Sequence, residues 1–479
     1  MLPDIENELQ HYRRHFAGKT VLCNCDDPFE SNFFKYFVLN FNRLKIKKLI
    51  ATSYTGSPIA DQELPLFDIV PGAEPKKPRK AIVTEVYDAN GDGGIDMLDV
   101  AELFKHGKNQ LLELAGDGDF RSKECRDLMD EADVVVTNPP FSLFREYVAT
   151  LMAHGKKFII MGNQNAITYK EIFPLLMRNE MWLGTRSGHT LFAVPSTYEI
   201  PDFYDKNDRQ RLRANGYVVD ENGKLWRNLG NICWFTNLDH KKRHEELILV
   251  PRYDAERYPK YDNYDAIDVS RVQDIPFDYE PGYLVPIEYK QQLIDAGFIL
   301  GSERKNDSGS VCVCVCGATI TAPNCASERN PVLQRDNGGS DNILRQTLSG
   351  TVRDIGGGLF TGGANNQGRQ RESKPAANVC EWAQALFSCL GSQENAEWCN
   401  GIMGVPVTFF DKHNPDQFEL LGMTDRNNMY GLTTRVYTKE ESDDFGNLNR
   451  RGAIRCSDGT LRATYARILI RRKMAQGVS

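Results

Sequence analysis

The sequence predicts an α/β fold in which a mostly parallel β-sheet carries helices on both faces, followed by a mixed, mostly β C-terminal region. Three observations lead to this prediction. Short runs of buried-type apolar residues alternate with segments of helical spacing between residues 19 and 163. Polar residues directly follow several of those runs, as they do where parallel strands end at a ligand site. Beyond about residue 185, Tyr-, Asp-, Asn- and Pro-rich pieces replace the helical spacing.

The composition limits what kind of protein this is. The chain has 479 residues, long enough for two or three domains, and 41% of them are hydrophobic, enough to bury a core. No apolar run approaches the ~18 residues of a membrane span, and residues 1–19 lack the apolar segment of a secretory signal. Twelve cysteines in such a chain favour reduced thiols, so we expect a cytoplasmic protein. With a net charge of −7, any contact with nucleic acid needs a local basic patch.

The first elements form a β-α-β unit over residues 19–55. Its helix is expected in residues 31–44, where apolar residues recur at helical spacing after Ser31, a residue type that caps helix N-termini. After a Pro-rich connection, residues 80–87 and 110–120 predict two more strands, and the second of these ends in the acidic turn "GDGDF".

The next strand joins a helix directly in "DVVVTNPPFSLFREYV", residues 133–148. Two prolines in this join remove two backbone donors and fix two φ angles, so the turn is stiff. Gly155 ends the helix, and residues 156–163 predict a further strand. One face of the helix carries the apolar residues Leu143, Phe144, Tyr147, Val148 and Leu151.

Changes in composition divide the chain into four expected parts. Short β-like pieces follow residue 185, among them residues 231–238, with Trp234 buried, and residues 245–253. A Gly-, Asn- and Cys-rich stretch then has the composition of an insertion with long flexible loops. The expected parts are residues 1–184, 185–301, 302–397 and 398–479.

Two stretches that flank the insertion form a weak internal sequence repeat. Residues 282–301 and 401–422 share a Val-Pro pair and end in the similar groups "FILG" and "FELLG". Two explanations stay open, namely duplication of one element around the insertion and chance resemblance.

The turn Asn138-Pro139-Pro140-Phe141 suits chemistry on a planar amino nitrogen. Such a nitrogen is a poor nucleophile because its lone pair is delocalised, and two acceptors on its N–H groups favour a pyramidal, more nucleophilic form. The Asn138 side-chain oxygen and the Pro139 carbonyl are the candidate acceptors, and proline stiffness fixes them in advance. Phe141 is the candidate ring to stack on a base swung out of a duplex. The alternative is a Pro-rich strand-to-helix connection without a catalytic role.

An Asn-Pro-Pro-Phe motif is the signature of S-adenosylmethionine-dependent amino methyltransferases, and longer stretches narrow the resemblance. "KKFIIMGNQNAITYKEIFP", "ICWFTNLDHKKRHEEL" and "GIMGVPVTFFDKHNPDQFELLG" look like the EcoRI-type adenine-specific DNA methyltransferase family. The resemblance covers roughly residues 15–55, 110–280 and 397–473 and leaves out the insertion. It implies a Rossmann-like methyltransferase sheet in the first expected part of the chain, and target recognition in the second and fourth parts.

The activity of that family is transfer of a methyl group from S-adenosylmethionine to adenine N6 of a flipped-out base in duplex DNA. The resemblance implies duplex DNA as partner, a cognate restriction endonuclease acting on the same site, and a monomer that does not enter a membrane. It implies as catalytic residues Asn138, Pro139, Pro140 and Phe141. Two alternatives stay open: methyl transfer to RNA or to a protein glutamine, and a DNA-binding relic that lost the cofactor. Phe rather than Tyr at position 141 and the long C-terminal region favour DNA.

One group of candidate cofactor residues follows the first strand. It consists of Asp26, Asp27, Pro28 and Phe29, where Asp27 is placed to accept from the cofactor's amino group and Phe29 to pack on it. The loop departs from the family's pattern, because Glu-Ser-Asn at residues 30–32 stands where glycines are expected, and this hinders close approach of the backbone. An Asx-type turn that caps the next helix is the alternative.

A second group of candidate cofactor residues lies in "GDGDF". Asp119 and Phe120 are placed to bracket the cofactor adenine, with Asp119 accepting from its amine, and a tight acidic turn is the alternative. The segment "IATSY" lacks the acidic residue that usually holds ribose hydroxyls, so no residue is assigned to that contact.

Two segments raise the question of a metal. "DANGDGGIDMLD" fits a calcium loop, although a strand rather than a helix precedes it and its last position is Asp rather than Glu. Its candidate ligands are Asp88, Asn90, Asp92, Asp96 and Asp99. A solvated acidic turn is the alternative. In the insertion, Cys312, Cys314 and Cys316 share one face of an expected strand, and buried apolar cysteines are favoured over zinc because no C-x-x-C pair is present.

Two basic segments are candidates for contact with DNA phosphates. "DHKKRHEE" offers Lys241, Lys242 and Arg243, and "ARILIRRK" offers Arg467, Arg471, Arg472 and Lys473. A solvated charge run is the alternative for each segment.

Overall fold

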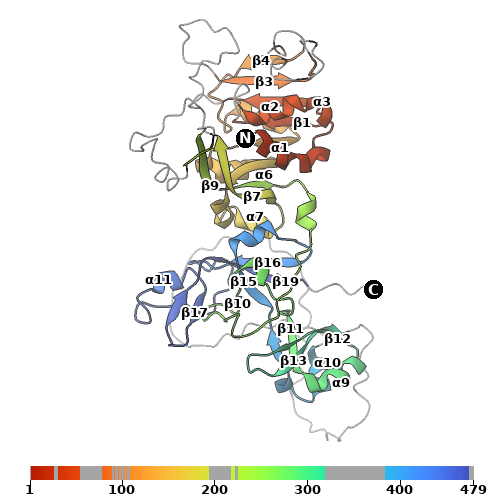
Figure 1. Cartoon of the computed structure of the whole chain (residues 1–479), viewed down its shortest axis with the longest axis vertical. Helices are drawn as coiled ribbons and strands as arrows, with labels where there is room; N and C mark the ends of the chain where they lie inside the picture. Colours follow the sequence, from red (N-terminus) through yellow and green to blue (C-terminus); the bar gives the residue numbers. More distant parts are fainter. Residues whose placement is uncertain are drawn as a thin grey trace, which may run out of the picture. The chain divides into compact units, whose positions relative to one another are not determined.

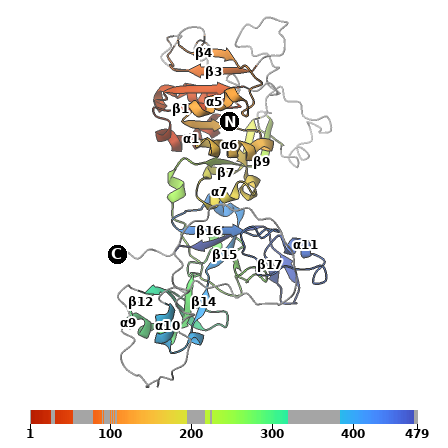
Figure 2. The same ribbon diagram turned by 180° about the vertical axis from the view of Figure 1, so that it is seen from behind.

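Figures 1 and 2 show the computed structural model of the chain. It describes residues 2–25, 31–53, 78–88, 108–193, 217–221, 225–318 and 383–473, together with the single residues 91, 95, 99, 102 and 104. The chain divides into a larger unit, residues 1–281 with 400–479, and a smaller unit, residues 282–399. In the part of the chain that the structure describes, no helix has the length and apolar character needed to span a membrane.

The larger unit is built around a mixed sheet. Its described strands run in the order β4-β3-β2-β1-β5-β6-β9-β7, with β8 paired to β9. They are β1 (Thr20–Cys23), β2 (Lys48–Thr52), β3 (Arg79–Val83), β4 (Gln110–Glu113), β5 (Val134–Thr137), β6 (Lys157–Asn163), β7 (Trp182–Ala193), β8 (Tyr217–Val219) and β9 (Leu225–Thr236).

Only the centre of this sheet is parallel. The strands β2, β1, β5 and β6 run in one direction, and Leu22 lies beside both Ile50 and Val135. The remaining strands pair antiparallel with their neighbours. The α/β fold class is confirmed, but the expectation of a mostly parallel sheet is wrong outside the centre. A parallel pair needs a crossover, usually a helix, whereas the sequence between β2 and β3 is Pro-rich and has no helical spacing.

Short helices connect the strands of the larger unit. They are α1 (Leu2–Leu9), η1 (Gln10–His15), α2 (Asn32–Leu39), α3 (Phe41–Leu44), α5 (Lys123–Glu131), η2 (Phe141–Leu143), α6 (Phe144–Ala153), η3 (Gln164–Thr168), α7 (Phe173–Met177), η4 (Lys241–His244) and η5 (Val272–Asp274), where η marks a 3-10 helix. The predicted cap of α2 is confirmed, because the Ser31 hydroxyl accepts from the backbone nitrogens of Phe33 and Phe34 at 3.1 and 3.3 Å. The predicted apolar face of α6 is confirmed by the burial of Phe144, Tyr147, Val148 and Leu151. Leu143, also predicted for this face, lies in η2 before the helix and is only half-buried.

Both faces of the central strands are covered. Val21 and Val134 belong to one hydrophobic core with Phe16 and Phe37 from the N-terminal helices. Side chains alternate between the faces of a strand, so Leu22 and its neighbours in the same row point to the opposite face, and they are also fully buried. Helices α2 and α3 lie over the sheet in Figure 1, and α5 lies over it in Figure 2, which views the molecule from behind.

Residues 245–253, which the sequence favours as β-like, form no strand. The side chain of Gln417 takes the place of a partner strand, because it accepts from the Leu247 nitrogen and donates to the Leu247 oxygen, both at 2.8 Å. Ile248 and Val250 are 83% and 74% exposed. An apolar run becomes a strand only where another strand is available to pair with it. By contrast, Trp234 is buried in β9, as predicted.

The C-terminal part of the larger unit contains a second sheet in the order β10-β15-β19-β16. Its elements are β10 (Ile267–Asp268), β15 (Ile402–Pro406), η8 (Val407–Asp411), β16 (Phe418–Met423) and β19 (Arg467–Arg472), joined by α11 (Phe445–Leu448) and the hairpin of β17 (Ala453–Arg455) and β18 (Leu461–Ala463). A buried ion pair lies inside it. Asp268 Oδ1 accepts from Arg467 Nε at 2.9 Å and from the Tyr261 hydroxyl at 2.6 Å. These partners offset the cost of removing both charges from water.

The smaller unit is a separate sheet in the order β12-β13-β11-β14. Its elements are β11 (Gly282–Pro286), η6 (Ile287–Tyr289), α9 (Lys290–Asp295), β12 (Phe298–Lys305), β13 (Val311–Ala318), α10 (Ala383–Leu390), η7 (Gln393–Asn395) and β14 (Glu397–Cys399). The expected strand "VCVCVC" is confirmed as part of β13. Val313 and Val315 face the core of the unit, while Cys312 and Cys314 alternate with them and are also buried.

The two regions of the weak internal repeat, residues 282–301 and 401–422, fold in the same way. In each, a strand that ends at the shared Val-Pro pair continues into a 3-10 helix, β11 into η6 and β15 into η8. In each, a strand from further along the chain pairs antiparallel between the first strand and the next, giving the orders β11-β13-β12 and β15-β19-β16. This shared topology favours duplication over chance.

The chain leaves the larger unit and returns to it at one place. Gly401 has a φ of +67°, and a Cβ at this position would lie 2.6 Å from the Pro281 nitrogen, so glycine is required here. The two ends of segment 282–399 are therefore attached at adjacent points.

Candidate active site

The candidate catalytic turn stands at the carboxyl end of the parallel strands. It follows β5 directly, on the edge of the sheet where ligands bind in folds of this class. Asn138 and Phe141 are exposed, Phe141 to 39%, whereas Pro139 is buried. The Pro140 carbonyl accepts from the Leu143 nitrogen at 2.9 Å, which begins η2 and leads into α6. The amide of Asn138 and the ring of Phe141 thus face solvent, while the backbone between them is anchored at the buried Pro139.

A row of three polar residues crosses the strand ends beside this turn. Thr52 ends β2, Asn24 follows β1 and Thr137 ends β5, and the strand register places them side by side. Thr52 Oγ1 donates to Asn24 Oδ1 at 2.8 Å, and Thr137 Oγ1 donates to the Asn24 carbonyl oxygen. All three residues are buried. Sequence reasoning missed this row, although its signal is visible as a polar residue at the end of each apolar strand.

The candidate residues Asp26, Asp27, Pro28 and Phe29 lie outside the described residues. Just before them, Cys25 has a φ of +61°, a left-handed conformation that usually requires glycine. The backbone nitrogen of Cys25 donates to Asn24 Oδ1 at 2.9 Å, and this hydrogen bond supports the sharp turn. The chain therefore leaves β1 in a strained, left-handed conformation at a residue that is not glycine.

The structure places Asp119 and Phe120 in different environments. The Phe120 ring is buried and packs edge-to-face on Tyr147, with ring centroids 4.9 Å apart. The Asp119 carboxylate accepts from Arg121 Nε and Nη2 at 2.9 and 2.6 Å, and these hydrogen bonds lower its pKa. The group is therefore ionised at neutral pH. The Arg121 backbone nitrogen also donates to Asp119 Oδ1, at 2.8 Å. A carboxylate has about four acceptor positions, so these three hydrogen bonds leave room for one further donor.

The structure gives no support to a metal site. Asn90, Asp92 and Asp96 of the acidic loop lie outside the described residues, and Asp88 Oδ1 accepts from the Gly91 nitrogen at 2.6 Å, as in an Asx turn. Across the described ranges, no three His, Cys, Asp or Glu side chains come together in a way that could hold an ion. This holds for Asp99 and for the described cysteines of the smaller unit. Calcium binding stays a prediction that the described residues do not support, and the burial of Cys312 and Cys314 agrees with the apolar interpretation favoured over zinc.

Most of the candidate phosphate-binding cations have partners within the chain. Lys242 Nζ donates to the Thr185 oxygen at 2.6 Å, and the Arg243 guanidinium lies 3.6 Å from the centre of the Trp182 ring. Arg471 donates to Glu419 at 2.7 Å, and Arg472 donates to the Phe277 oxygen. Arg467 is buried in the ion pair with Asp268, so a phosphate contact expected from it is wrong. Lys241 is exposed. The DNA-binding role of these residues stays a prediction, and Lys241 is the best placed of them.

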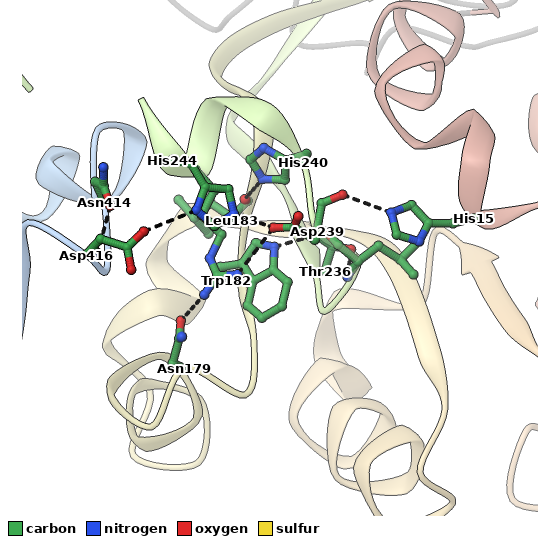
Figure 3. Close-up of polar contacts among 12 residues, drawn as sticks. His15, Asn179, Trp182, Leu183, Thr236, Asp239, His240, His244, Asn414 and Asp416 are labelled. Carbon is green, nitrogen blue, oxygen red and sulfur yellow. Dashed lines mark hydrogen bonds and ion pairs between the residues drawn. The ribbon is translucent and has the colours of Figure 1, made fainter. Parts of the chain in front are cut away.

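Figure 3 shows the polar network that contains this basic run. Nε2 of His244 lies 2.7 Å from Asp239 Oδ1, and its Nδ1 lies 3.4 Å from Asp416 in the C-terminal part of the same unit. The hydrogen bond with Asp239 raises the pKa of His244. Nε2 of His15 lies 2.9 Å from the Asp239 main-chain oxygen. The segment "DHKKRHEE" therefore connects three parts of the unit, a role that its charges alone do not indicate.

A buried histidine, His240, and a half-buried one, His413, line a small pocket beside this network. Nε2 of His240 lies 2.9 Å from the Leu183 oxygen. His413 lies across the pocket, after η8, and burial lowers its pKa to about 4. His413 is therefore neutral at physiological pH.

Comparisons with known proteins agree on one family. The family model described as "Adenine-specific methyltransferase EcoRI" matches residues 1–311 and 394–473. The chain is 42% identical over 307 residues to the Type II methyltransferase M.EcoRI of Escherichia coli, which covers 63% of this chain and 84% of that protein. It is 34% identical over 293 residues to the Type II methyltransferase M.MpnI of Mycoplasma pneumoniae, covering 60% and 76% of the two chains. No solved structure gives a significant match.

Proposed function

Since the chain belongs to the EcoRI family of adenine-specific methyltransferases, we propose that it transfers a methyl group from S-adenosylmethionine to adenine N6 in duplex DNA. The observation that carries this proposal is the Asn-Pro-Pro-Phe turn, with an exposed amide and an exposed ring at the carboxyl end of a central parallel strand. The target base leaves the duplex to reach the turn, because an amine inside the base stack is not accessible.

The turn acts on the amine before the methyl group arrives. The Asn138 side-chain oxygen and the Pro139 carbonyl accept hydrogen bonds from the two N–H groups, which favours a pyramidal and more nucleophilic nitrogen. The prolines fix both acceptors before the base binds, so little reorganisation is needed in the transition state. Phe141 stacks on the face of the base and offsets part of the few kcal/mol lost on unstacking. When bound, S-adenosylmethionine supplies the methyl group on a sulfonium centre.

The residues at the strand ends fit this cofactor. Asp119 is ionised and has one acceptor position left for the cofactor's adenine amine, while Phe120 is proposed to lie on the other side of the adenine. Because the Phe120 ring is buried against Tyr147, this second contact requires the ring to become accessible. Asp27 and Phe29, with their neighbours Asp26 and Pro28, are proposed to hold the methionine part. A buried amide donor at the end of β1 adds a group that an oxygen of the cofactor can satisfy.

The partners follow from the same reaction. We propose duplex DNA as the substrate, held through phosphates by exposed cations such as Lys241. A cognate restriction endonuclease that cleaves the same unmethylated site is the proposed functional partner, and the enzyme is proposed to act as a monomer in the cytoplasm.

One assay tests the proposal against its alternatives. Tritiated S-adenosylmethionine is offered to the enzyme with duplex DNA, RNA or protein, and methylated DNA is digested to nucleosides and identified by mass spectrometry. We expect label in duplex DNA alone, as N6-methyl-2′-deoxyadenosine, and at least a hundredfold slower labelling with the Asn138→Ala variant. Label in RNA or protein, or N4-methyl-2′-deoxycytidine in the DNA digest, would refute the proposed substrate. Binding of DNA without any methyl transfer would identify a DNA-binding protein that has lost its catalytic activity.

A further inference from the structure

Asn24 carries a buried hydrogen-bond donor without a partner. The residue is fully buried, and none of the described residues supplies an acceptor to its Nδ2. Its Oδ1, in contrast, accepts from the Cys25 backbone nitrogen at 2.9 Å and from Thr52 Oγ1 at 2.8 Å. A backbone N–H can only donate, so the bond from Cys25 fixes which end of the amide is oxygen. Turning the amide over would break this bond and leave a donor facing a donor.

An unsatisfied donor of this kind requires an explanation. It costs about 1–3 kcal/mol if nothing accepts from it, and native proteins leave few buried polar groups in this state. Asn24 lies at the end of β1, between Thr52 of β2 and Thr137 of β5, on the edge where the parallel strands end. Ligands of such sheets bind beyond this edge. A ligand that brings an acceptor would therefore complete the hydrogen bonding of Asn24.

The neighbouring hydroxyls do not compete for that ligand. Each threonine hydroxyl has one proton, and those of Thr52 and Thr137 are both donated to oxygens of Asn24. In the row of three polar residues, the Asn24 amide is thus the side-chain donor left for a ligand. Its position also suits a methyl donor, because Thr137 directly precedes Asn138, which holds the amine.

We propose that Asn24 Nδ2 donates to the carboxylate of the methionine part of S-adenosylmethionine, an inference that rests on the function proposed above. A carboxylate is the strongest acceptor on this cofactor, and a hydrogen bond to a charged group is worth about 1.5–3 kcal/mol. In this proposal Asn24 contacts both the cofactor and the strand that leads into the catalytic turn. Its side chain binds the cofactor. Its main-chain oxygen accepts from Thr137, the residue directly before the catalytic turn.

The test replaces the donor and keeps the acceptor. Asn24→Asp has the same shape and still accepts from Cys25 and Thr52, but it offers no N–H to the ligand. We expect its dissociation constant for S-adenosylhomocysteine, measured by calorimetry, to rise at least tenfold. For 5′-methylthioadenosine, which lacks the amino acid part, the constant should stay within threefold of wild type. Asn24→Ala, which also removes Nδ2, should show the same selectivity and serves if the aspartate variant does not fold.

A matched control separates binding from damage to the site. Thr52→Val removes a hydrogen bond to Asn24 Oδ1 but leaves Nδ2, so its affinity for S-adenosylhomocysteine should stay within threefold of wild type. Circular dichroism and the melting temperature report whether each variant is folded.

The outcomes distinguish this inference from the proposed function. Wild type that binds neither nucleoside ligand would refute the proposed function itself. If wild type binds and a folded Asn24 variant binds S-adenosylhomocysteine equally well, Asn24 has no contact with the cofactor and the inference fails alone. Equal losses for both ligands would place the contact on the nucleoside part and overturn the assignment to the carboxylate.

Discussion

Buried Pro139 separates two side chains that face solvent. Asn138 precedes it and Phe141 follows two residues later, so both groups are attached to a backbone anchored in the interior. The two proline rings fix two φ angles of this backbone. Amide and ring are therefore held in place before a substrate binds, and a substitution of one should leave the other where it is.

Asn138→Ala should lower single-turnover methyl transfer at least a hundredfold. The amide acts on the amine in the transition state, and one lost preorganised polar contact costs about 2.7–4 kcal/mol. Folding and affinity for S-adenosylhomocysteine should stay nearly unchanged, because Asn138 is exposed. Rapid-quench measurement with saturating enzyme checks this, and a rate within fivefold of wild type would rule out the assigned role.

Phe141→Ala should raise the KM for DNA tens-fold, and by more than Asn138→Ala does, whereas Phe141→Trp should keep most activity. Stacking of a base on an aromatic ring is worth about 1–3 kcal/mol. Fluorescence of 2-aminopurine at the target position should rise when wild type binds, and the alanine variant should change that signal. Leu112→Ala removes a similarly exposed apolar side chain, 43% exposed on β4, and is the control. Unchanged DNA affinity and fluorescence in the Phe141→Ala variant would remove the stacking role.

His413 should make the protein less stable in acid. Its folded pKa of about 4 lies below its ordinary value of 6.5, so the unfolded chain binds more protons between these pH values. The free energy of unfolding therefore falls as pH falls through this window, by at most ~1.4 kcal/mol per pH unit. Urea titrations of wild type and His413→Gln from pH 4 to 7 should show a flatter dependence in the variant.

His244 provides the control of opposite sign. Asp239 raises its pKa, so its contribution is present below the ordinary pKa and is lost as pH rises through the folded value. His244→Gln should therefore lower the melting temperature more at pH 5.5 than at pH 8.5. If both histidine variants shifted stability in the same direction with pH, the assigned environments would be wrong.

At the scale of elements, the basic run in η4 divides into two kinds of cation. Arg243→Ala should lower the free energy of unfolding by about 1–2 kcal/mol, because its guanidinium stacks on Trp182 and is partly buried. Lys241→Ala should leave stability unchanged. It should weaken binding to DNA of any sequence and reduce the slope of log affinity against log salt by about one. A Lys241 variant with an unchanged salt slope would place the phosphate contacts elsewhere.

The sequence predicts the existence of elements better than their pairing. The strands near residues 20, 50, 135 and 160, the cap at Ser31 and the buried face of α6 follow from local patterns and are confirmed. Strand direction is not a local property. The pairing of Leu49 with Val83 joins residues far apart in the chain. The hydrogen bonds of Leu247 to the side chain of Gln417, in place of a partner strand, also join distant residues.

The candidate site shows the same limit. The Asn-Pro-Pro-Phe turn is contiguous, so its residues could be found from the sequence together with its position at a strand end. For the row of Thr52, Asn24 and Thr137, the sequence shows only that each residue ends an apolar run. Their contact with one another depends on the register of three strands. The internal partners of Arg243 and Arg472 also come from distant segments, and a count of charges does not reveal them.

At the scale of the whole molecule, deletion of residues 282–399 should leave a folded protein that still binds S-adenosylhomocysteine. Pro281 and Gly401 are adjacent, so a short Gly/Ser linker can join the ends without moving the strands beside them. Deletion of residues 303–396 is the informative comparison. It removes Val313, Val315 and the core residues of α10, leaves Val285 and its remaining neighbours exposed, and should produce an aggregation-prone protein. Calorimetry and light scattering test both deletion variants. Loss of cofactor binding in a folded 282–399 deletion would contradict the division of the chain into two independent units.

The adjacency of Pro281 and Gly401 has a consequence for the history of this family. A segment with coincident attachment points can be gained, lost or exchanged while the rest of the protein keeps its structure. The family model already leaves residues 312–393 of this chain unmatched. Members of the family should therefore vary in length mainly between these two points, and their spacing from the Asn-Pro-Pro-Phe motif to Pro281 should stay nearly constant.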